Sequence, residues 1–66
     1  MKICDFTVPE MNRFRELCNF TYDEMTYFNL RSKNKSNVQI AYEMNVSEST
    51  VSVLARKVKK KIVRVL

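Results

Sequence analysis

The sequence from Ser36 to Ile62 reads SNVQIAYEMNVSESTVSVLARKVKKKI and contains two helical patterns that meet at residues 45–47. The apolar positions of the two patterns are Ile40, Ala41 and Met44, then Val51, Leu54, Val58 and Ile62. Both sets follow the i, i+3, i+4, i+7 spacing of a helix with one apolar face. The sequence therefore predicts two helices joined by a very short turn.

The residues at this turn suit a sharp corner between two helices. Asn45 stands where the chain needs a left-handed backbone, which Asn tolerates better than most residues. Ala41 is small where the two helices must cross closely, and Val46 can fill the angle between them. The pattern is that of a helix-turn-helix, the unit that lays its second helix in the DNA major groove.

Capping signals mark the start of each predicted helix. Thr7-Val8-Pro9-Glu10 and Thr21-Tyr22-Asp23-Glu24 are capping boxes, and Pro9 is compatible with a first turn. Ser36 with Gln39, and then Ser47, cap the two helices of the helix-turn-helix. We therefore expect an all-α, four-helix domain that takes in all of residues 1–66, with helices near 8–18, 22–32, 37–44 and 48–64.

The apolar residues of the first two helices predict which sides face the core. In the first helix they are Val8, Met11, Phe14, Leu17 and Cys18. In the second they are Met25 and Phe28, with Tyr27 and Leu30 as further candidates, and Phe20 is placed to staple onto this helix. The Phe, Tyr and Met residues at helical spacing indicate core packing rather than a binding surface.

Length and composition fit one small globular domain: 66 residues, 45% apolar and 29% charged. No apolar run is long enough to span a membrane, and Asp5 interrupts any signal peptide. We therefore expect a cytoplasmic protein. The chain has no Gly, which makes strand-rich folds with tight hairpins improbable.

The sequence lacks the residues of a catalytic or metal site. It has no His, no Gly-rich phosphate loop and no patterned acid–base pair. Cys4 and Cys18 lack metal-ligand spacing, and Cys18 fits a small core position, although a disulfide between the two remains open. We expect no enzyme, metal, cofactor or small-molecule ligand.

Charge is unevenly distributed along the chain. Residues 1–33 carry five basic and five acidic side chains, a net charge of zero, whereas residues 34–66 carry seven basic and two acidic, a net charge of +5. Six of these basic residues fall between Arg56 and Arg64. A basic stripe on one helix indicates a polyanionic partner. The alternative is a solvated helix end whose cations suit the helix dipole.

From Thr21 onward the sequence resembles the LuxR/GerE-type DNA-binding domain, and the likeness covers residues 20–62 without a gap. Its most specific parts are Ser36-Asn37-x-x-Ile40-Ala41 and Ser47-x-x-Thr50-Val51. The remaining matching positions are Thr21, Glu24, Phe28, Leu30, Met44, Val58, Lys61 and Ile62. The resemblance implies a DNA-binding regulator with base contacts from the positions of Ser52, Val53 and Arg56.

The sequence also departs from that family. Thr26 stands where the family usually has Glu, Asn34 where it has Gly, Ser52 where Lys is common and Leu54 where His is frequent. The family's further helix, which often pairs two domains, has no room before Leu66. Region 4 of bacterial sigma factors shares much of the pattern, including a basic end like residues 56–61, and is the closest rival.

Helical geometry divides the last helix into an inner and an outer face. At 100° per residue, Leu54, Ala55, Val58, Ile62 and Val65 lie within about 60° of Val51. The outward face is small near its start and basic further along. The candidate base readers are Ser49, Ser52, Val53 and Arg56. The candidate phosphate contacts are Ser36, Thr50, Lys57 and Lys60. Ser36 and Ser47 serve first as helix caps, and Lys59 and Lys61 are expected to be solvated.

These observations predict a small sequence-specific double-stranded DNA-binding protein that regulates transcription. The alternative is a protein-interaction module on the same scaffold, such as a sigma-like or anti-repressor partner that contacts RNA polymerase. One reading helix contacts few base pairs, so we also expect a weak homodimer. Its surface would be the apolar tail with Val63, Val65 and Leu66, the first helix through Phe14 or Met11, or both. Otherwise the tail folds onto Ile3 and Phe6 and leaves a monomer.

Overall fold

Each helix of the protein begins at a Ser or Thr side chain that accepts a backbone N–H. The computed structural model describes residues 5–66, which form four helices: α1 (Val8–Leu17), α2 (Tyr22–Ser32), α3 (Asn37–Met44) and α4 (Glu48–Val65). Thr7, Thr21, Ser36 and Ser47 are the four caps. The first three form complete capping boxes, because the Glu or Gln three residues later reaches back to the cap's own N–H. The predicted all-α fold is confirmed, with every helix boundary within one residue of expectation.

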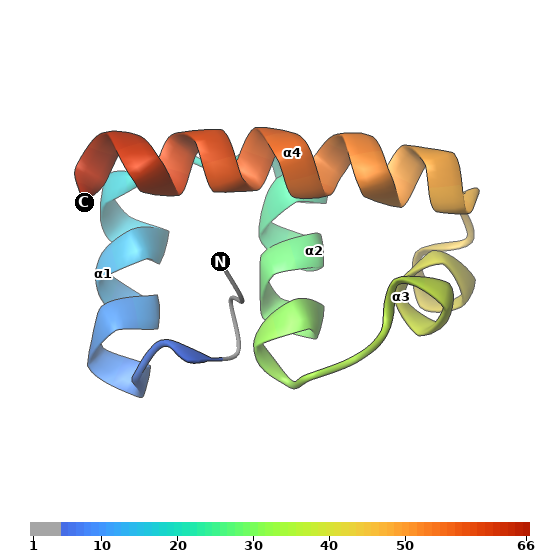
Figure 1. Cartoon of the computed structure of the whole chain (residues 1–66), viewed down its shortest axis with the longest axis horizontal. Coiled ribbons are helices and arrows are strands. Elements are labelled where there is room, and N and C mark those ends of the chain that lie inside the picture. Colours follow the sequence, from blue (N-terminus) through green and yellow to red (C-terminus); the bar gives the residue numbers. More distant parts are fainter. Residues whose placement is uncertain (1–4) are drawn as a thin grey trace.

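The long α4 helix is the element on which the other three pack (Figure 1). The α3 helix lies at its N-terminal end, α2 crosses near its middle, and α1 lies at its C-terminal end. The four residues of α4 that face this layer are fully or nearly fully buried: Val51, Leu54, Val58 and Ile62. The opposite side of α4 carries no other helix (Figure 1). This arrangement leaves one complete helix face open to solvent.

Asparagine makes the turns of this Gly-free chain. Asn45 ends α3 in the left-handed region, with φ 58° and ψ 45°, and the N–H of Val46 then donates to the Ala41 carbonyl at 3.0 Å. The prediction for Asn45 is thus confirmed, and the turn has the hydrogen bond of a Schellman motif. Asn19 and Asn34 also have positive φ, at 51° and 63°, and follow α1 and α2. A short polar side chain makes this backbone tolerable where Gly is absent.

The core confirms most of the predicted inward residues and corrects others. Met11, Phe14 and Cys18 of α1 are buried, but Val8 is 67% exposed and Leu17 is 49% exposed. Placing Val8 and Leu17 on the core side was wrong. Leu17 points about 100° away from Cys18, and Val8 lies in the first turn of α1, at the end farther from α4 (Figure 1). The burial of Met11 and Phe14 also rules them out as a dimer surface.

Aromatic residues fill the space between α1, α2 and the N-terminal segment. Phe28 is fully buried and Phe20 packs against it with ring centroids 5.2 Å apart, which confirms the predicted staple. Tyr27 is buried, whereas Met25 is only half-buried and lies outside the core cluster. Phe6 packs edge-on against Phe14 at 4.8 Å. The predicted contact between Ile3 and the C-terminal tail lies outside the described residues.

Two further features of residues 5–66 concern the buried cysteine and the possibility of a membrane-spanning helix. Cys18 has a free, buried thiol, and burial raises the pKa of that thiol. Cys4 lies outside the described residues. Within residues 5–66, no helix combines the length and the apolar character needed to cross a membrane.

Candidate nucleic-acid interface

All four candidate base readers lie on the open side of α4. Ser49, Ser52, Val53 and Arg56 are exposed, and Val53 retains 43% of its surface although it is apolar. They occupy the first half of the helix. Val51 and Leu54, which lie among them in the sequence, point into the core instead. The structure therefore brings a small hydroxyl, a methyl-bearing side chain and a guanidinium to one continuous surface. That surface has the chemistry for reading base edges in a major groove.

The candidate phosphate contacts surround this surface. Lys57 and Lys60 are exposed on α4, and Thr50 is exposed in its first turn. Ser47 Oγ accepts the Thr50 N–H at 3.2 Å and lies 3.1 Å from Thr50 Oγ1, so the two hydroxyls share a hydrogen bond. Ser36 Oγ accepts the Gln39 N–H at 3.2 Å and is exposed. The expected capping roles of Ser36 and Ser47 are confirmed, and the hydroxyl hydrogen of Ser36 stays available to donate.

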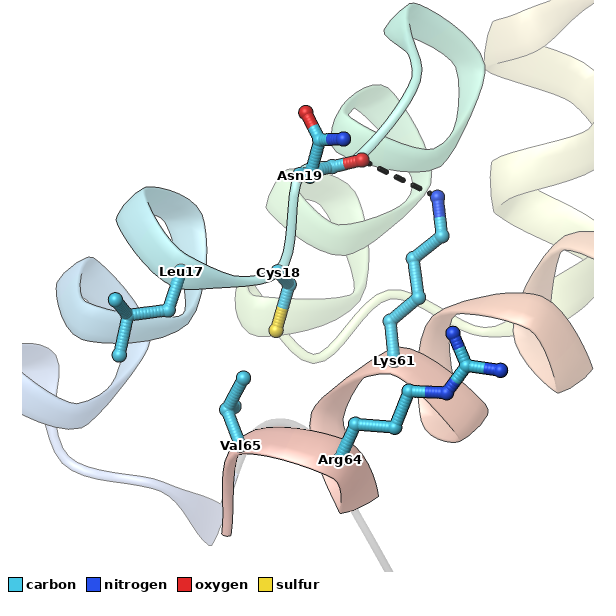
Figure 2. Close-up of a pocket in the computed structure, with 6 residues that line it drawn as sticks. All are labelled: Leu17, Cys18, Asn19, Lys61, Arg64 and Val65. Carbon is cyan, nitrogen blue, oxygen red and sulfur yellow. Dashed lines mark hydrogen bonds between the residues drawn. The ribbon is translucent and has the colours of Figure 1, made fainter.

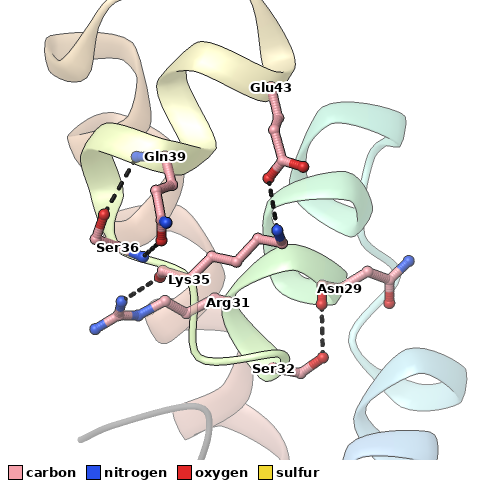
Figure 3. Close-up of polar contacts among 7 residues, drawn as sticks. All are labelled: Asn29, Arg31, Ser32, Lys35, Ser36, Gln39 and Glu43. Carbon is pink, nitrogen blue, oxygen red and sulfur yellow. Dashed lines mark hydrogen bonds and ion pairs between the residues drawn. The ribbon is translucent and has the colours of Figure 1, made fainter.

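The loop before α3 is held by the predicted Ser36–Gln39 cap and by two contacts that the sequence reasoning missed (Figure 3). Arg31 of α2 donates from Nη1 to the Lys35 carbonyl at 2.6 Å, and Lys35 forms an ion pair with Glu43 of α3 at 3.4 Å. The Ser36 N–H donates to Gln39 Oε1 at 3.0 Å. Together these contacts fix the entry of the chain into α3. No sequence signal marks the Arg31 contact, because its acceptor is a backbone carbonyl, which every residue carries.

Lys61 holds α4 in place instead of being solvated, which corrects our expectation for this residue. Its Nζ donates to the Asn19 carbonyl at 3.2 Å and forms a short ion pair with Glu24 of α2. Glu24 is 3% exposed. Burial alone would raise the pKa of this carboxyl, but hydrogen bonds from Lys61 and from Thr21, together with the Lys61 charge, hold the pKa below its usual value. Lys61 is therefore a structural cation and is not available to DNA.

The charge of α4 remains strongly positive on its open side. The helix carries six basic residues and one acidic residue, a net charge of +5. With Lys61 paired to Glu24, five basic residues are left exposed: Arg56, Lys57, Lys59, Lys60 and Arg64. A row of cations on one face concentrates positive potential where a polyanion would approach. The basic stripe predicted from the sequence is thus exposed on α4.

Residues 5–66 show no cluster of side chains typical of a metal site. No group of three or more His, Cys, Asp or Glu side chains in residues 5–66 is placed to hold a metal ion. The described surface also has hollows. One of them lies on the outer face of α3, and Val38 and Tyr42 are among the residues that line it. The open face of α4 is the surface on which the structure gathers exposed cations and the candidate base readers.

Residues 19–63 match the model of the family described as bacterial regulatory proteins, luxR family. The match covers 45 of the 66 residues and takes in α2, α3 and α4 as far as Val63. The resemblance to this family expected from the sequence is confirmed. The likeness to region 4 of sigma factors rests on the sequence pattern alone. Members of this family are helix-turn-helix regulators of transcription that bind double-stranded DNA, and the family is not enzymatic. No curated protein and no solved structure matches the chain.

Proposed function

Because this chain belongs to the luxR family of bacterial regulatory proteins, we propose that it recognises specific double-stranded DNA sequences and so regulates transcription. Residues 1–66 act as one DNA-binding domain in the cytoplasm, where bacterial DNA lies. The α4 helix enters the major groove with its N-terminal half toward the bases. The observation that carries this proposal is the open face of α4, on which exposed reading groups are followed directly by exposed cations.

The base readers act through the donors, acceptors and methyl groups that each side chain presents. Arg56 offers a planar pair of N–H donors that fits the O6 and N7 acceptors of guanine. Val53 offers methyl groups for the thymine C5-methyl, and its 43% exposure on a polar surface supports this role. Ser49 and Ser52 lie close enough to the start of α4 to donate or accept at neighbouring base edges.

The phosphate contacts position the domain and carry no sequence information. Lys60 supplies charge further along the reading face and Lys57 supplies it on one flank, while the hydroxyls of Ser36 and Thr50 contact the backbone from the starts of α3 and α4. Each of these helix N-termini carries a dipole that favours an anion. Neutralising several phosphates makes the affinity strongly salt-dependent.

A second candidate function is favoured by the outer face of α3. Val38 is 61% exposed and Tyr42 is 87% exposed, and both line a hollow of about 440 Å³ together with Lys35, Gln39 and Glu43. An exposed apolar pair at i, i+4 is a typical docking surface for another protein. On DNA this face would be free to meet RNA polymerase. Such a contact adds to DNA binding and does not replace it.

A gel shift on random-sequence duplex at increasing salt tests DNA binding directly. The chain should bind at low salt, and the logarithm of its affinity should fall linearly with the logarithm of salt concentration. A Lys57→Ala, Lys60→Ala double variant should bind more weakly with a slope smaller by about two, since each lost phosphate contact changes the slope by about one. No binding at low salt, or a salt-independent affinity, would contradict the proposal and leave the protein-interaction module as the better account.

A further inference from the structure

Glu48, the first residue of α4, is an exposed acid at the start of a helix that is otherwise basic. It is the one acidic residue of α4, which carries six basic residues. The carboxylates of Glu10, Glu24 and Glu43 each have a hydrogen-bond or ion-pair partner. The carboxylate of Glu48 has no such partner within residues 5–66. It therefore keeps its full capacity to accept hydrogen bonds from a bound molecule.

The cap of α4 does not use Glu48. In α1, α2 and α3 the Glu or Gln that completes the capping box stands at the third helical position, whereas the third position of α4 is Thr50. Ser47 Oγ accepts the Thr50 N–H at 3.2 Å. Glu48 stands at the first position and makes no contact with the cap. The hydrogen bonds that begin α4 therefore leave the role of this carboxylate open.

Glu48 begins the row of α4 side chains that also contains two candidate base readers. Residues four apart are neighbours on a helix surface, and Glu48, Ser52 and Arg56 follow one another at this spacing. All three are exposed. Because each Cα–Cβ bond of a helix tilts toward its N-terminus, the first side chain extends past the end of α4. In the proposed function this end faces the base pairs, so Glu48 lies where α4 meets the base edges.

The cations of α4 lie too far along the helix to pair with Glu48. Arg56 comes first, eight residues later, which is a rise of about 12 Å. Lys61 lies near the other end of α4, where its Nζ donates to the Asn19 carbonyl and Arg64 lines the same hollow (Figure 2). DNA phosphates therefore repel Glu48 unless its carboxylate meets a hydrogen-bond donor. The donors that the major groove presents are the amino groups of cytosine and adenine.

We propose that Glu48 is a fifth base-reading residue, whose carboxylate accepts a hydrogen bond from the N4 amino group of a cytosine in the bound site. This inference rests on the proposed function. Cytosine suits a carboxylate better than adenine, because the N7 acceptor of adenine lies beside its N6 amino group and repels the negative charge. At guanine and thymine the carboxylate faces acceptors. Glu48 thus adds specificity partly by weakening the binding of other sequences.

Affinities for a systematically altered site test the cytosine contact. A site is selected with the wild-type chain, and duplexes with each of the four base pairs at every position are then titrated. Glu48→Ala is the test variant, and Glu16→Ala is its matched control, because Glu16 is an exposed acid on α1, outside the reading face. Wild type and Glu16→Ala should prefer cytosine at one position by about tenfold. Glu48→Ala should bind all four bases at that position within about twofold and keep the other preferences.

Binding to random-sequence duplex separates base reading from a structural role at the start of α4. The positive end of the helix dipole favours a carboxylate, so a structural role alone predicts that Glu48→Ala weakens binding to every duplex equally. Base reading by repulsion predicts the opposite sign. Glu48→Ala should bind random duplex at least about twofold more tightly than Glu16→Ala does.

The outcomes for Glu48 and for DNA binding itself can be told apart. A cytosine preference that Glu48→Ala retains, a selected site at which wild type prefers no cytosine, or an equal loss on all duplexes would overturn the role of Glu48. Each of these results would leave the proposed function in place. A wild-type chain that binds no duplex would instead refute the proposed function, and the role of Glu48 with it.

Discussion

Lys61 on α4 and Glu24 on α2, 37 residues apart in the sequence, form a partly buried ion pair that ties α4 to the rest of the domain. Lys61 also donates to the Asn19 carbonyl at 3.2 Å, in the turn between α1 and α2. One ammonium group therefore links α4 to α2 and to the turn that joins α1 to α2. This contact fixes the rotation of α4 about its own axis, and so determines which side chains face outward.

Removing this cation should destabilise the fold strongly. Lys61→Met would leave the Glu24 carboxylate, 3% exposed, with the Thr21 N–H but without its cation, and losing a hydrogen bond to a charged group costs about 1.5–3 kcal/mol. Lys59→Met is the matched control, because Lys59 is exposed and should change the free energy of unfolding by less than about 0.5 kcal/mol. Chemical denaturation measures both. Equal effects of the two substitutions would show that the pair adds nothing.

The same pair predicts how stability depends on acid. The pKa of Glu24 is lowered in the folded protein from the ordinary 4.5, because the hydrogen bonds and charge of its partners outweigh burial. A lowered carboxyl pKa contributes stability that is complete above about pH 4.5 and is lost as the pH falls through the folded value. Glu24→Gln should therefore be less stable than wild type at pH 7, and the gap should narrow below pH 4.5. Parallel curves from pH 7 to pH 3 would refute this role.

The left-handed turn at Asn45 gives a test of the helix-turn-helix geometry. With φ at 58°, Asn45→Ala places a Cβ in a strained conformation and should lower the free energy of unfolding by about 1–2 kcal/mol. Asn45→Gly is the control and should be close to neutral, because Gly has no Cβ to clash. Thermal or chemical denaturation distinguishes them. If Ala and Gly behave alike, the turn relaxes to another backbone conformation.

Local chemistry explains why the helices could be predicted so closely. The caps at Thr7, Thr21, Ser36 and Ser47 bind backbone groups within three residues, so the sequence shows them directly. The left-handed turn at Asn45 is also local, because Asn tolerates this backbone conformation. The missed contact with the largest structural role, between Lys61 and Glu24, is long-range. Nothing near Lys61 indicates a carboxylate 37 residues earlier. The exposure of Leu17, by contrast, could have been predicted, because Leu17 lies about 100° from Cys18 around the helix. The predicted roles of the exposed residues on α4 are left to experiment.

Two substitutions on the open face of α4 should separate base reading from phosphate contact. Arg56→Ala should weaken binding to the preferred site by about 1–3 kcal/mol and relax the preference at one base pair. Lys60→Ala should weaken all duplexes similarly and reduce the salt slope by about one. Affinities for the preferred and for singly altered duplexes, each at several salt concentrations, provide the comparison. Identical behaviour of the two variants would refute the division of roles.

Selection of bound sequences from a random duplex pool tests the central claim, that the open face of α4 reads specific DNA sequence. The wild-type chain should enrich a short motif, and the same selection with Arg56→Ala should return that motif with one position no longer specified, since Arg56 is exposed on the reading face. A pool that stays random after repeated rounds, or a motif unchanged by Arg56→Ala, would contradict this account of α4.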